Sequence, residues 1–403
     1  MLNMWTSNVM NMWRKKRVYL DSAAAAPVLP RAWKAYVNAV QQYANPSSPH
    51  MEGRDAHDLL EAARAQIASL AEVKPDAVIF TGTATEANAL ALRGRVEALH
   101  AKGRAYEDMH ILYAPGAHAS LVHTVESIAA LGVSTEPLKY KHEQLDKELL
   151  AKQLTKNTVL ISVSAVCGET GDITPVRDIR RAIDSANKIH SGETLLHVDA
   201  SQLPRVAPFE LTRLGAHLLT LDAQKVGGVR GIGALIAPRQ VALTPLLQGG
   251  GQERGLRPGT QSPALAKAFA EALMHTHETR AVFTEQAQNL RSLLTKEIAS
   301  LQNLVINEGK EQAPHILNIS LLGRDTDYLV ALLDESGFAV STRSACETDE
   351  EGSRAVFELS GDKVRASSTV RISWGPETTR ADIFSFSRAL IRCVKFLDSA
   401  GIL

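Results

Sequence analysis

Cysteine is scarce in this chain: three residues of 403, Cys167, Cys346 and Cys393. An odd number of widely separated cysteines fits neither a disulfide framework nor the paired spacing of a zinc site. Unpaired thiols indicate a reducing compartment. We therefore expect a cytoplasmic protein without a metal.

Neither sign of charge is in excess, and long apolar runs are missing. Lys plus Arg and Asp plus Glu number 44 each, so the formal net charge is +0. This balance argues against a nucleic-acid binder that relies on a basic surplus. No apolar run approaches the roughly 18 residues of a membrane span. We expect neither nucleic acid nor a membrane as a partner.

The N-terminal segment has a composition of its own. No acidic residue precedes Asp21, and a basic cluster lies at residues 14–17. The first 17 residues are interpreted either as a disordered leader or as an organellar targeting segment, and their few arginines and hydroxyl groups favour the leader.

Short β-rich runs alternate with helical patterns over the first 240 residues, which predicts βαβ units and a mainly parallel sheet. Strands are expected at residues 78–81, 110–113, 159–163, 195–199, 217–221 and 233–237, and helices at 84–99, 120–131 and 175–187. The pattern changes near Gly249. Beyond it we expect helices at 263–298, 326–335 and 380–397 and strands at 315–321 and 370–374. A large α/β domain and a smaller α+β domain are predicted.

The turn after the first of these strands has the features of an anion site. It reads Phe80-Thr81-Gly82-Thr83-Ala84-Thr85-Glu86. Free amides at a helix N-terminus, beside small residues, attract phosphate. Thr83 and Glu86 also have the spacing of a capping box. The motif alone supports a phosphate cradle and a well-made helix start equally.

Two further residues lie where strands are expected to end. Lys225 precedes a glycine pair, and Asp199 closes another strand. Most lysines are solvated surface groups, but one fixed at such a place can bond to an aldehyde cofactor. Pyridoxal phosphate catalysis needs such a lysine, a carboxylate at the pyridine nitrogen and a phosphate cradle. Lys225, Asp199 and the Thr83–Thr85 turn supply all three at strand ends, where open α/β sheets bind ligands.

Ordered motifs extend from Val18 to the last expected helix. They are Val18-Tyr19-Leu20-Asp21, Asn45-Pro46-Ser47-Ser48-Pro49-His50, the turn at 81–86, His197-Val198-Asp199-Ala200-Ser201-Gln202, Lys225 before Gly231-Ile232-Gly233-Ala234-Leu235, residues 249–257, Ser344-Ala345-Cys346 and Val370-Arg371-Ile372-Ser373. With these motifs the chain resembles the cysteine desulfurases, in the class-V aminotransferase branch of fold-type-I pyridoxal-phosphate enzymes. The resemblance implies an α/β fold with a mainly parallel seven-stranded sheet. It places the large cofactor-binding domain at residues 32–260 and the small domain at 1–31 and 261–403.

The resemblance also implies roles for single residues. Lys225 would hold pyridoxal 5'-phosphate covalently and move the substrate's α-proton, and His118 would stack on the cofactor ring and take part in catalysis. The remaining cofactor and substrate contacts would come from Ala84 and Thr85 at the phosphate, Asp199 at the pyridine nitrogen, Gln202 at the phenolic oxygen, Thr260 at the phosphate of the neighbouring subunit, and Arg371 at the substrate carboxylate. A bidentate guanidinium suits that last role. Because Thr260 would contact the phosphate of the neighbouring subunit, the expected assembly is a homodimer.

Cys346 is the residue that would distinguish a desulfurase. It lies in a polar segment expected to be exposed and able to move, as sulfur transfer requires. The resemblance implies conversion of L-cysteine to L-alanine with a persulfide on Cys346. A sulfur-acceptor protein would then supply a pathway such as iron–sulfur cluster assembly or tRNA thiolation. Cys167 and Cys393 lie in apolar or helical patterns and are expected to be packing residues.

The chain departs from the family at three positions. Gly168 replaces an asparagine, and Asp222 and Gln224 stand where serine and histidine are usual. Two alternatives stay open: a related lyase acting on selenocysteine or cysteine sulfinate, and a degenerate non-catalytic paralogue. We expect Asp222 either to point away, paired with a cation such as Arg230, or to weaken cofactor binding.

Overall fold

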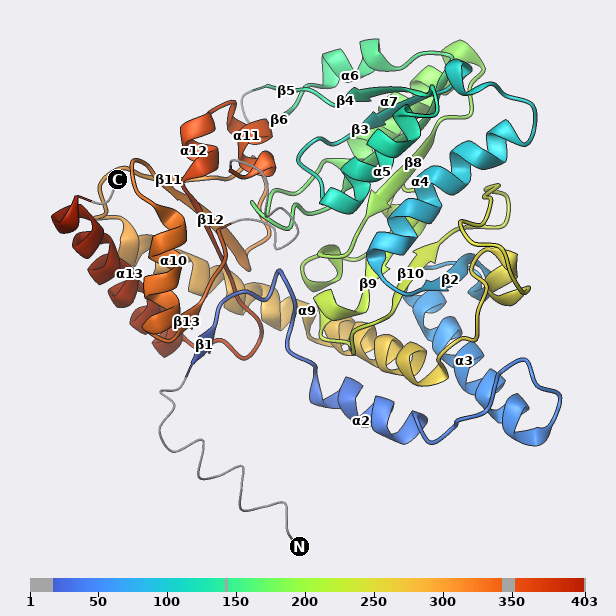
Figure 1. Ribbon diagram of the computed structural model, residues 1–403, viewed down its shortest axis with the longest axis horizontal. Coiled ribbons are helices and arrows are strands. Elements are labelled where there is room, and N and C mark those ends of the chain that lie inside the picture. The colour runs from blue at the N-terminus through green and yellow to red at the C-terminus, as the bar shows by residue number, and fades with distance from the viewer. Residues whose placement is uncertain (1–16, 142–143, 343–351, 402–403) are drawn as a thin grey trace, which may run out of the picture.

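A computed structural model describes residues 17–141, 144–342 and 352–401 (Figure 1). A larger α/β part and a smaller α+β part lie side by side. The long helix α9 (Pro263–Ile298) runs from one to the other.

The larger part is built on a seven-stranded sheet, as predicted, with the strand order β2-β10-β9-β8-β7-β3-β4. Its strands are β2 (Val78–Thr81), β3 (His110–Tyr113), β4 (Ser134–Pro137), β7 (Thr158–Ser164), β8 (Leu195–Asp199), β9 (Leu218–Asp222) and β10 (Gly233–Ile236). β10 is antiparallel to both of its neighbours, and the four pairs from β9 to β4 are parallel. The near-continuous apolar runs of β7 and β8 are buried, as expected of strands covered on both faces.

Helices surround this sheet. They are α2 (Pro30–Ala39), α3 (Met51–Leu70), α4 (Ala84–His100), α5 (Ala119–Ala129), α6 (Lys147–Gln153), α7 (Val176–His190) and α8 (Leu211–Leu214). α2 and α3 pack against α9, and α4 packs against α5 and the strands β8 to β10. Short 3₁₀ helices lie at Pro75–Ala77, Tyr106–Asp108, Leu203–Arg205, Ala223–Val226 and Gln252–Gly255, and a small hairpin joins β5 (Tyr140–Lys141) to β6 (Gln144–Leu145).

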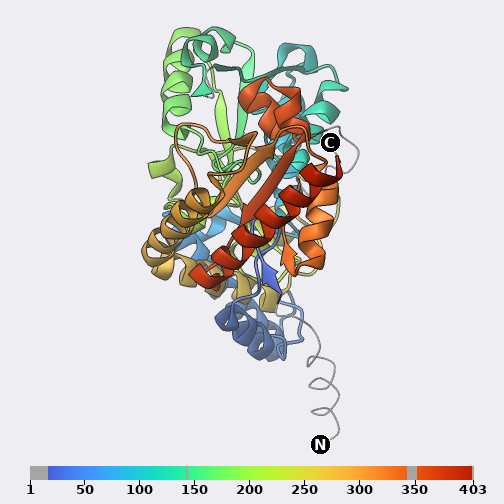
Figure 2. The same cartoon turned by 90° about the vertical axis from the view of Figure 1, so that its left-hand side faces the viewer.

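The smaller part has a three-stranded antiparallel sheet of β11 (Leu304–Ile306), β12 (Ile316–Leu321) and β14 (Thr369–Ser373). The helices α10 (Thr326–Glu335), α11 (Arg354–Ser360), α12 (Lys363–Ser367) and α13 (Arg380–Ala400) accompany it. Figure 2 shows α13 lying across the sheet. The N-terminal strand β1 (Val18–Tyr19) pairs with β13 (Phe338–Ala339), which ties the chain's beginning to this part.

Each part has its own hydrophobic core, and α9 contributes to both. Phe269 and Leu273 belong to the core around the large sheet, whereas Phe283 and Leu290 belong to the core of the smaller part. The change from one core to the other falls within α9, between Leu273 and Phe283, so the expected boundary between residues 260 and 261 stays a proposal. Within the described ranges, no helix is both long and apolar enough to span a membrane.

Candidate active site

A cavity of about 330 Å³ opens at the carboxyl ends of strands β3, β7, β8 and β9. Seven of the residues predicted from the sequence line it: Ala84, Thr85, His118, Asp199, Gln202, Lys225 and Arg371. They are spread over nearly 290 positions of the chain. The carboxyl ends of the strands in the large sheet bring six of them together at one edge, and β14 of the smaller part supplies Arg371.

The start of α4 forms one wall of the cavity. Thr83 is the N-cap, and its Oγ1 accepts the Glu86 N–H at 3.3 Å. The Glu86 carboxylate accepts the Gly82 N–H at 2.6 Å rather than that of Thr83, so the predicted capping box is formed only in part. Gly233 makes room for this turn, because a Cβ there would lie 2.8 Å from the Ala84 nitrogen. The amides that begin a 17-residue helix thus border the cavity, which favours an anion there.

Lys225 lies on the 3₁₀ turn that follows β9. Gly227 ends this turn with φ of 76°, and a Cβ there would lie 2.7 Å from Leu29, so the turn requires glycine. The Lys225 Nζ donates hydrogen bonds to the carbonyl oxygens of Ala23 at 2.9 Å and Ala24 at 2.7 Å. The lysine is therefore fixed in direction at the cavity wall.

Asp199, at the end of β8, is buried and accepts three hydrogen bonds. Ser201 donates its N–H at 2.9 Å and its hydroxyl at 2.6 Å to Oδ1, and Asn88 Nδ2 donates to Oδ2 at 2.9 Å. The three donors hold the orientation of this carboxylate. Such a group suits a protonated ring nitrogen.

His118 is the N-cap of α5, and its half-buried side chain lines the cavity. Its Nδ1 accepts the Ser120 N–H at 3.1 Å and lies 2.8 Å from Ser120 Oγ. Burial lowers the pKa of His118, a shift that Asp199 opposes and Lys225 reinforces. The ring is therefore neutral near pH 7.

Gln202 and Arg371 each present a buried polar atom to which the structure assigns no hydrogen-bond partner. Gln202 donates Nε2 to the Ala23 carbonyl at 2.8 Å, and its Oε1 is unsatisfied. Arg371 donates Nη1 to the Gly168 carbonyl at 3.1 Å and Nη2 to Asp21 at 2.8 Å, and its Nε is unsatisfied. Unsatisfied polar atoms beside a cavity indicate a polar ligand.

These residues fit pyridoxal phosphate. A lysine, a carboxylate, a neutral imidazole and a helix N-terminus surround one cavity, with unsatisfied amide and guanidinium atoms at its edge. This donor set matches an aldehyde, a pyridinium nitrogen, an aromatic ring and a phosphate.

The three departures from the family line the same cavity. The Asp222 carboxylate accepts the Gln224 N–H at 3.0 Å and the Gln224 side-chain amide at 3.4 Å. No ion pair between Asp222 and Arg230 occurs in the described part of the chain, so the first of the two expected arrangements is not found. Burial raises the pKa of Asp222, and Lys225 opposes this rise.

Of the two cysteines expected to be packing residues, only one lies in a hydrophobic core. Cys346 lies outside the described residues. Cys393 is buried in the core of the smaller part, as expected, but Cys167 lines the cavity, which corrects its assignment as a packing residue. The Cys167 Sγ accepts the Thr170 N–H at 3.5 Å, and burial raises the pKa of this thiol.

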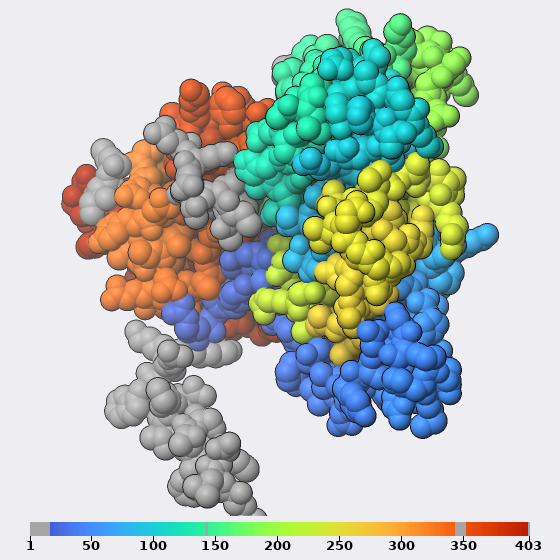
Figure 3. Space-filling view, turned by 45° about the vertical axis from the view of Figure 1, so that its right-hand side comes forward, coloured from blue at the N-terminus to red at the C-terminus, as the bar shows by residue number. Residues whose placement is uncertain are grey.

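Thr260 does not line the cavity of its own chain and is exposed. Its segment, coloured yellow near residue 250, lies at the surface between α4 and the blue α2–α3 region (Figure 3). Glu253 anchors the segment, because its buried carboxylate pairs with Arg64 at 2.7 Å and accepts the Phe80 N–H.

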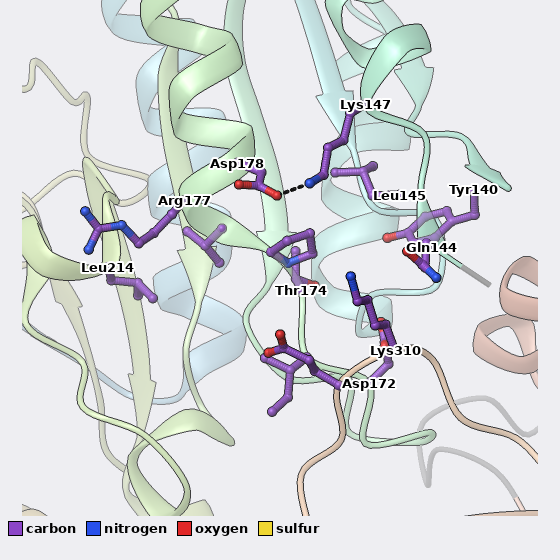
Figure 4. A pocket seen from close by; sticks show the side chains of 14 residues that line it. Tyr140, Gln144, Leu145, Lys147, Asp172, Thr174, Arg177, Asp178, Leu214 and Lys310 are labelled. Carbon is purple, nitrogen blue, oxygen red and sulfur yellow. Dashed lines mark ion pairs between the residues drawn. The ribbon is translucent and has the colours of Figure 1, made fainter. Parts of the chain in front are cut away.

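A second cavity, of about 390 Å³, is lined by residues of the β5–β6 hairpin, α6 and the start of α7 (Figure 4). Lys147 and Asp178 form an ion pair at one side of it, and Lys310 and Asp172 lie opposite. None of the predicted site residues lines it.

Sequence reasoning missed the residues that support the site. Asn88 and Ser120 contact Asp199 and His118, and Asp21 pairs with Arg371. Asn88 carried a usable signal, because it interrupts the apolar face of α4 between Ala84 and Ala91. Asp21 was part of a matched motif, but its partner lies 350 residues away.

The comparisons with known proteins agree with this geometry. The family model described as "Aminotransferase class-V" matches residues 18–386. A "Cysteine desulfurase IscS" of Methylococcus capsulatus is 32% identical, with 94% of this chain and 92% of the relative covered. A solved "NIFS-LIKE PROTEIN" is 29% identical with a TM-score of 0.87, covering 94% of this chain and all of its own. A structure titled "SspA in complex with cysteine" is 26% identical with a TM-score of 0.75, covering 90% and 99%.

Fold and cavity together define a fold-type-I enzyme that depends on pyridoxal phosphate. The chain belongs to the class-V aminotransferases and, among them, to the cysteine desulfurase family. The resemblance predicted from the sequence is confirmed.

Proposed function

We propose that this protein removes sulfur from L-cysteine, releases L-alanine and transfers the sulfur to Cys346 as a persulfide. The observation that carries the proposal is the single cavity that unites Lys225, Asp199, His118 and Arg371. The substrate is supported by the names of the relatives, one of which is described in complex with cysteine.

Each side chain has a task in this reaction. When bound, pyridoxal phosphate supplies an electron sink for the substrate's α-carbon. Asp199 would keep the ring nitrogen protonated, and Lys225 Nζ would hold the cofactor and take the α-proton. Ala84 and Thr85 hold the phosphate at the start of α4, and Gln202 holds the phenolic oxygen.

Arg371 is assigned to the substrate carboxylate. Two of its nitrogens are already bonded to Gly168 and Asp21, which fix the plane of the guanidinium. Its unsatisfied Nε then offers a charge-assisted hydrogen bond in a defined direction.

The sulfur step balances without an external oxidant. The Cys346 thiolate attacks the substrate sulfur, the carbon–sulfur bond breaks, and the carbon takes up a proton, so cysteine and a thiol become alanine and a persulfide. A thiol reductant or an acceptor protein then removes the terminal sulfur. We propose an acceptor protein as the physiological partner and the cytoplasm as the location, since free thiols persist in a reducing compartment.

We also propose a homodimer. Exposed apolar side chains cluster around α2: Trp33 is 55% exposed, Tyr43 88% and Met51 61%. Large apolar side chains exposed in one region of the chain favour association. In a dimer, Thr260 would act in the neighbouring subunit's site. Light scattering should give twice the 43.6 kDa chain mass, and Trp33→Glu should lower it.

Single-turnover chemistry tests the main proposal. Without a reductant, the cofactor-loaded protein and L-cysteine should give one alanine per subunit and one added sulfur on Cys346, measured by peptide mass spectrometry. Cys346→Ser should give no persulfide. Cys393→Ser, which changes a cysteine in the core of the smaller part, serves as the matched control. Equal alanine release by Cys346→Ser and the parent would refute the desulfurase mechanism and favour a lyase acting on selenocysteine or cysteine sulfinate.

A further inference from the structure

Four polar side chains, three of which line the active-site cavity, form a connected chain of hydrogen bonds. Asp199 Oδ2 accepts from Asn88 Nδ2 at 2.9 Å, and the same nitrogen donates to Ser120 Oγ at 3.0 Å. Ser120 Oγ lies 2.8 Å from His118 Nδ1. The chain joins three separate elements: the end of β8, the helix α4 and the start of α5.

The hydrogens available on Asn88 and Ser120 set the direction of this series of hydrogen bonds. The Asn88 amide nitrogen carries two hydrogens, and both are used, one for Asp199 and one for Ser120. Ser120 Oγ therefore accepts from Asn88 and can direct its own hydrogen to His118 Nδ1. The Asn88 side chain is fully buried, so no solvent competes for these bonds.

A second donor fixes the protonation of the ring. The backbone N–H of Ser120 also points at His118 Nδ1, at 3.1 Å. A peptide N–H is always a donor, so Nδ1 must present a lone pair. In the neutral ring the proton is then on Nε2, and His118 offers the cavity a hydrogen-bond donor.

We propose that Asn88 and Ser120 are positioning residues that hold His118 as the neutral Nε2–H tautomer and connect its orientation to the carboxylate of Asp199. The consequence is specific: His118 begins the reaction as a donor at Nε2 and not as a base. This consequence for catalysis rests on the proposed function, but the tautomer itself does not.

The charges around His118 set the background for this effect. Asp199 favours the charged ring, and Lys225, Arg354 and His123 disfavour it. Asn88 and Ser120 are uncharged, so changing them neither adds nor removes a charge around the ring. Any change in the ring's titration then reports on the hydrogen bonds.

The experiment measures the ring directly in the full chain without cofactor. Protein labelled with ¹⁵N in its histidine rings is compared as parent, Asn88→Ala, Ser120→Ala and the double variant, and His118→Gln identifies the signals of His118. In the parent, Nδ1 should resonate as an unprotonated nitrogen and Nε2 as a protonated one.

Each variant should weaken the donation to Nδ1. The titration midpoint of His118 should rise by about half a pH unit or more, because a hydroxyl bond that favours the neutral ring is lost or redirected. The double variant should match Ser120→Ala alone, because Asn88 acts through the Ser120 hydroxyl. A parent ring protonated at Nδ1, or a folded Ser120→Ala whose His118 titrates like the parent, would overturn the proposal.

A matched control separates this role from a general loss of packing. Asn307 is also a fully buried asparagine whose Nδ2 donates to two side chains, Asn318 and Ser320, but it lies in the smaller part. Asn307→Ala should leave the His118 signals unchanged. With cofactor and L-cysteine, Ser120→Ala should shift the acidic limb of the kcat profile upward in pH with little change in KM. If the single-turnover test fails while the ring signals behave as stated, the proposed substrate is wrong and the tautomer stands.

Discussion

The carboxylate of Asp222 should make cofactor binding weak and dependent on pH. Asp222 is the last residue of β9 and pairs with Gly233, where a Cβ would lie only 2.8 Å from the Ala84 nitrogen at the start of α4. A phosphate held by α4 is therefore a near neighbour of this carboxylate. At about 6 Å and an effective dielectric constant of about 20, each phosphate charge and an ionised carboxylate repel by about 3 kcal/mol.

Protonation of Asp222 relieves part of this repulsion. Burial raises the pKa of Asp222, and a bound phosphate raises it further because both groups are negative. Cofactor binding therefore takes up a proton wherever the free protein holds Asp222 ionised. The affinity of the parent should fall as pH rises through the pKa of Asp222 in the cofactor-free protein.

Two variants separate charge from shape. Asp222→Asn removes the charge alone, and Asp222→Ser with Gln224→His restores the residues usual in the family. Both should bind pyridoxal phosphate at least about tenfold tighter at pH 8, which corresponds to about 1.4 kcal/mol of the repulsion. The gain should shrink towards pH 6.

The assay is a fluorescence titration of cofactor-free protein at a series of pH values. Asp172→Asn is the control, because it removes another largely buried carboxylate that does not line this cavity. Equal affinities, or a gain that is the same at every pH, would refute the electrostatic reasoning and indicate a pocket rebuilt around Asp222 and Gln224.

Three other substitutions test neighbouring features. Lys225→Ala should stay folded, lose turnover, and no longer retain cofactor after borohydride reduction; turnover without added amine would contradict the assignment. Gly168→Asn should tighten cofactor binding about fivefold, because the asparagine amide adds a hydrogen bond of about 1 kcal/mol. There is room for the side chain, since a Cβ there would lie 3.5 Å from Gln202 Nε2. Unchanged affinity would show that water already makes this hydrogen bond. Burial raises the pKa of Asp172 to about 6, so this residue holds its proton more tightly in the folded than in the unfolded chain. The stability of the parent protein therefore falls as pH rises from about 4 to 6. Asp172→Asn should therefore raise the unfolding free energy by about 1 to 3 kcal/mol at pH 7 and leave it unchanged at pH 4, measured by urea unfolding.

Strong apolar runs made much of the fold predictable. The expected strands at 78–81, 110–113 and 195–199 coincide with β2, β3 and β8, and the helix at 263–298 coincides with α9. Elements without such runs were missed. β4 is an edge strand containing Glu136 and Pro137 with no fully buried residue, and β1 and β13 are two residues each, so their pairing depends on tertiary contact.

The site was predictable where residue type and strand end coincided, as at Asp199 and Lys225. It was not predictable where the role is to orient another side chain. Asn88, Ser120 and Asp199 are separated by 32 and 79 residues, and no local pattern records that one amide contacts both of the others. Cys346 was singled out by its polar context and by the motif Ser344-Ala345-Cys346, and it lies outside the described residues.

The strand order explains why these residues, which are far apart in the chain, lie in order along one edge of the sheet. From β3 through β7 and β8 to β9 the sheet follows the chain order, so His118, Gly168, Asp199 and Lys225 follow one another along one edge. Neighbouring strands lie about 4.8 Å apart, which spaces their ends at about the width of an aromatic ring. A planar cofactor across this edge would therefore meet a different side chain from each strand. On the far side β10 reverses direction and brings no residue of its own from a carboxyl end, so this side of the cavity depends on α4, Asp222 and Gln224. Two of the three departures from the family, Asp222 and Gln224, lie on this side, so changes there should alter cofactor affinity before they alter the chemistry at the α-carbon.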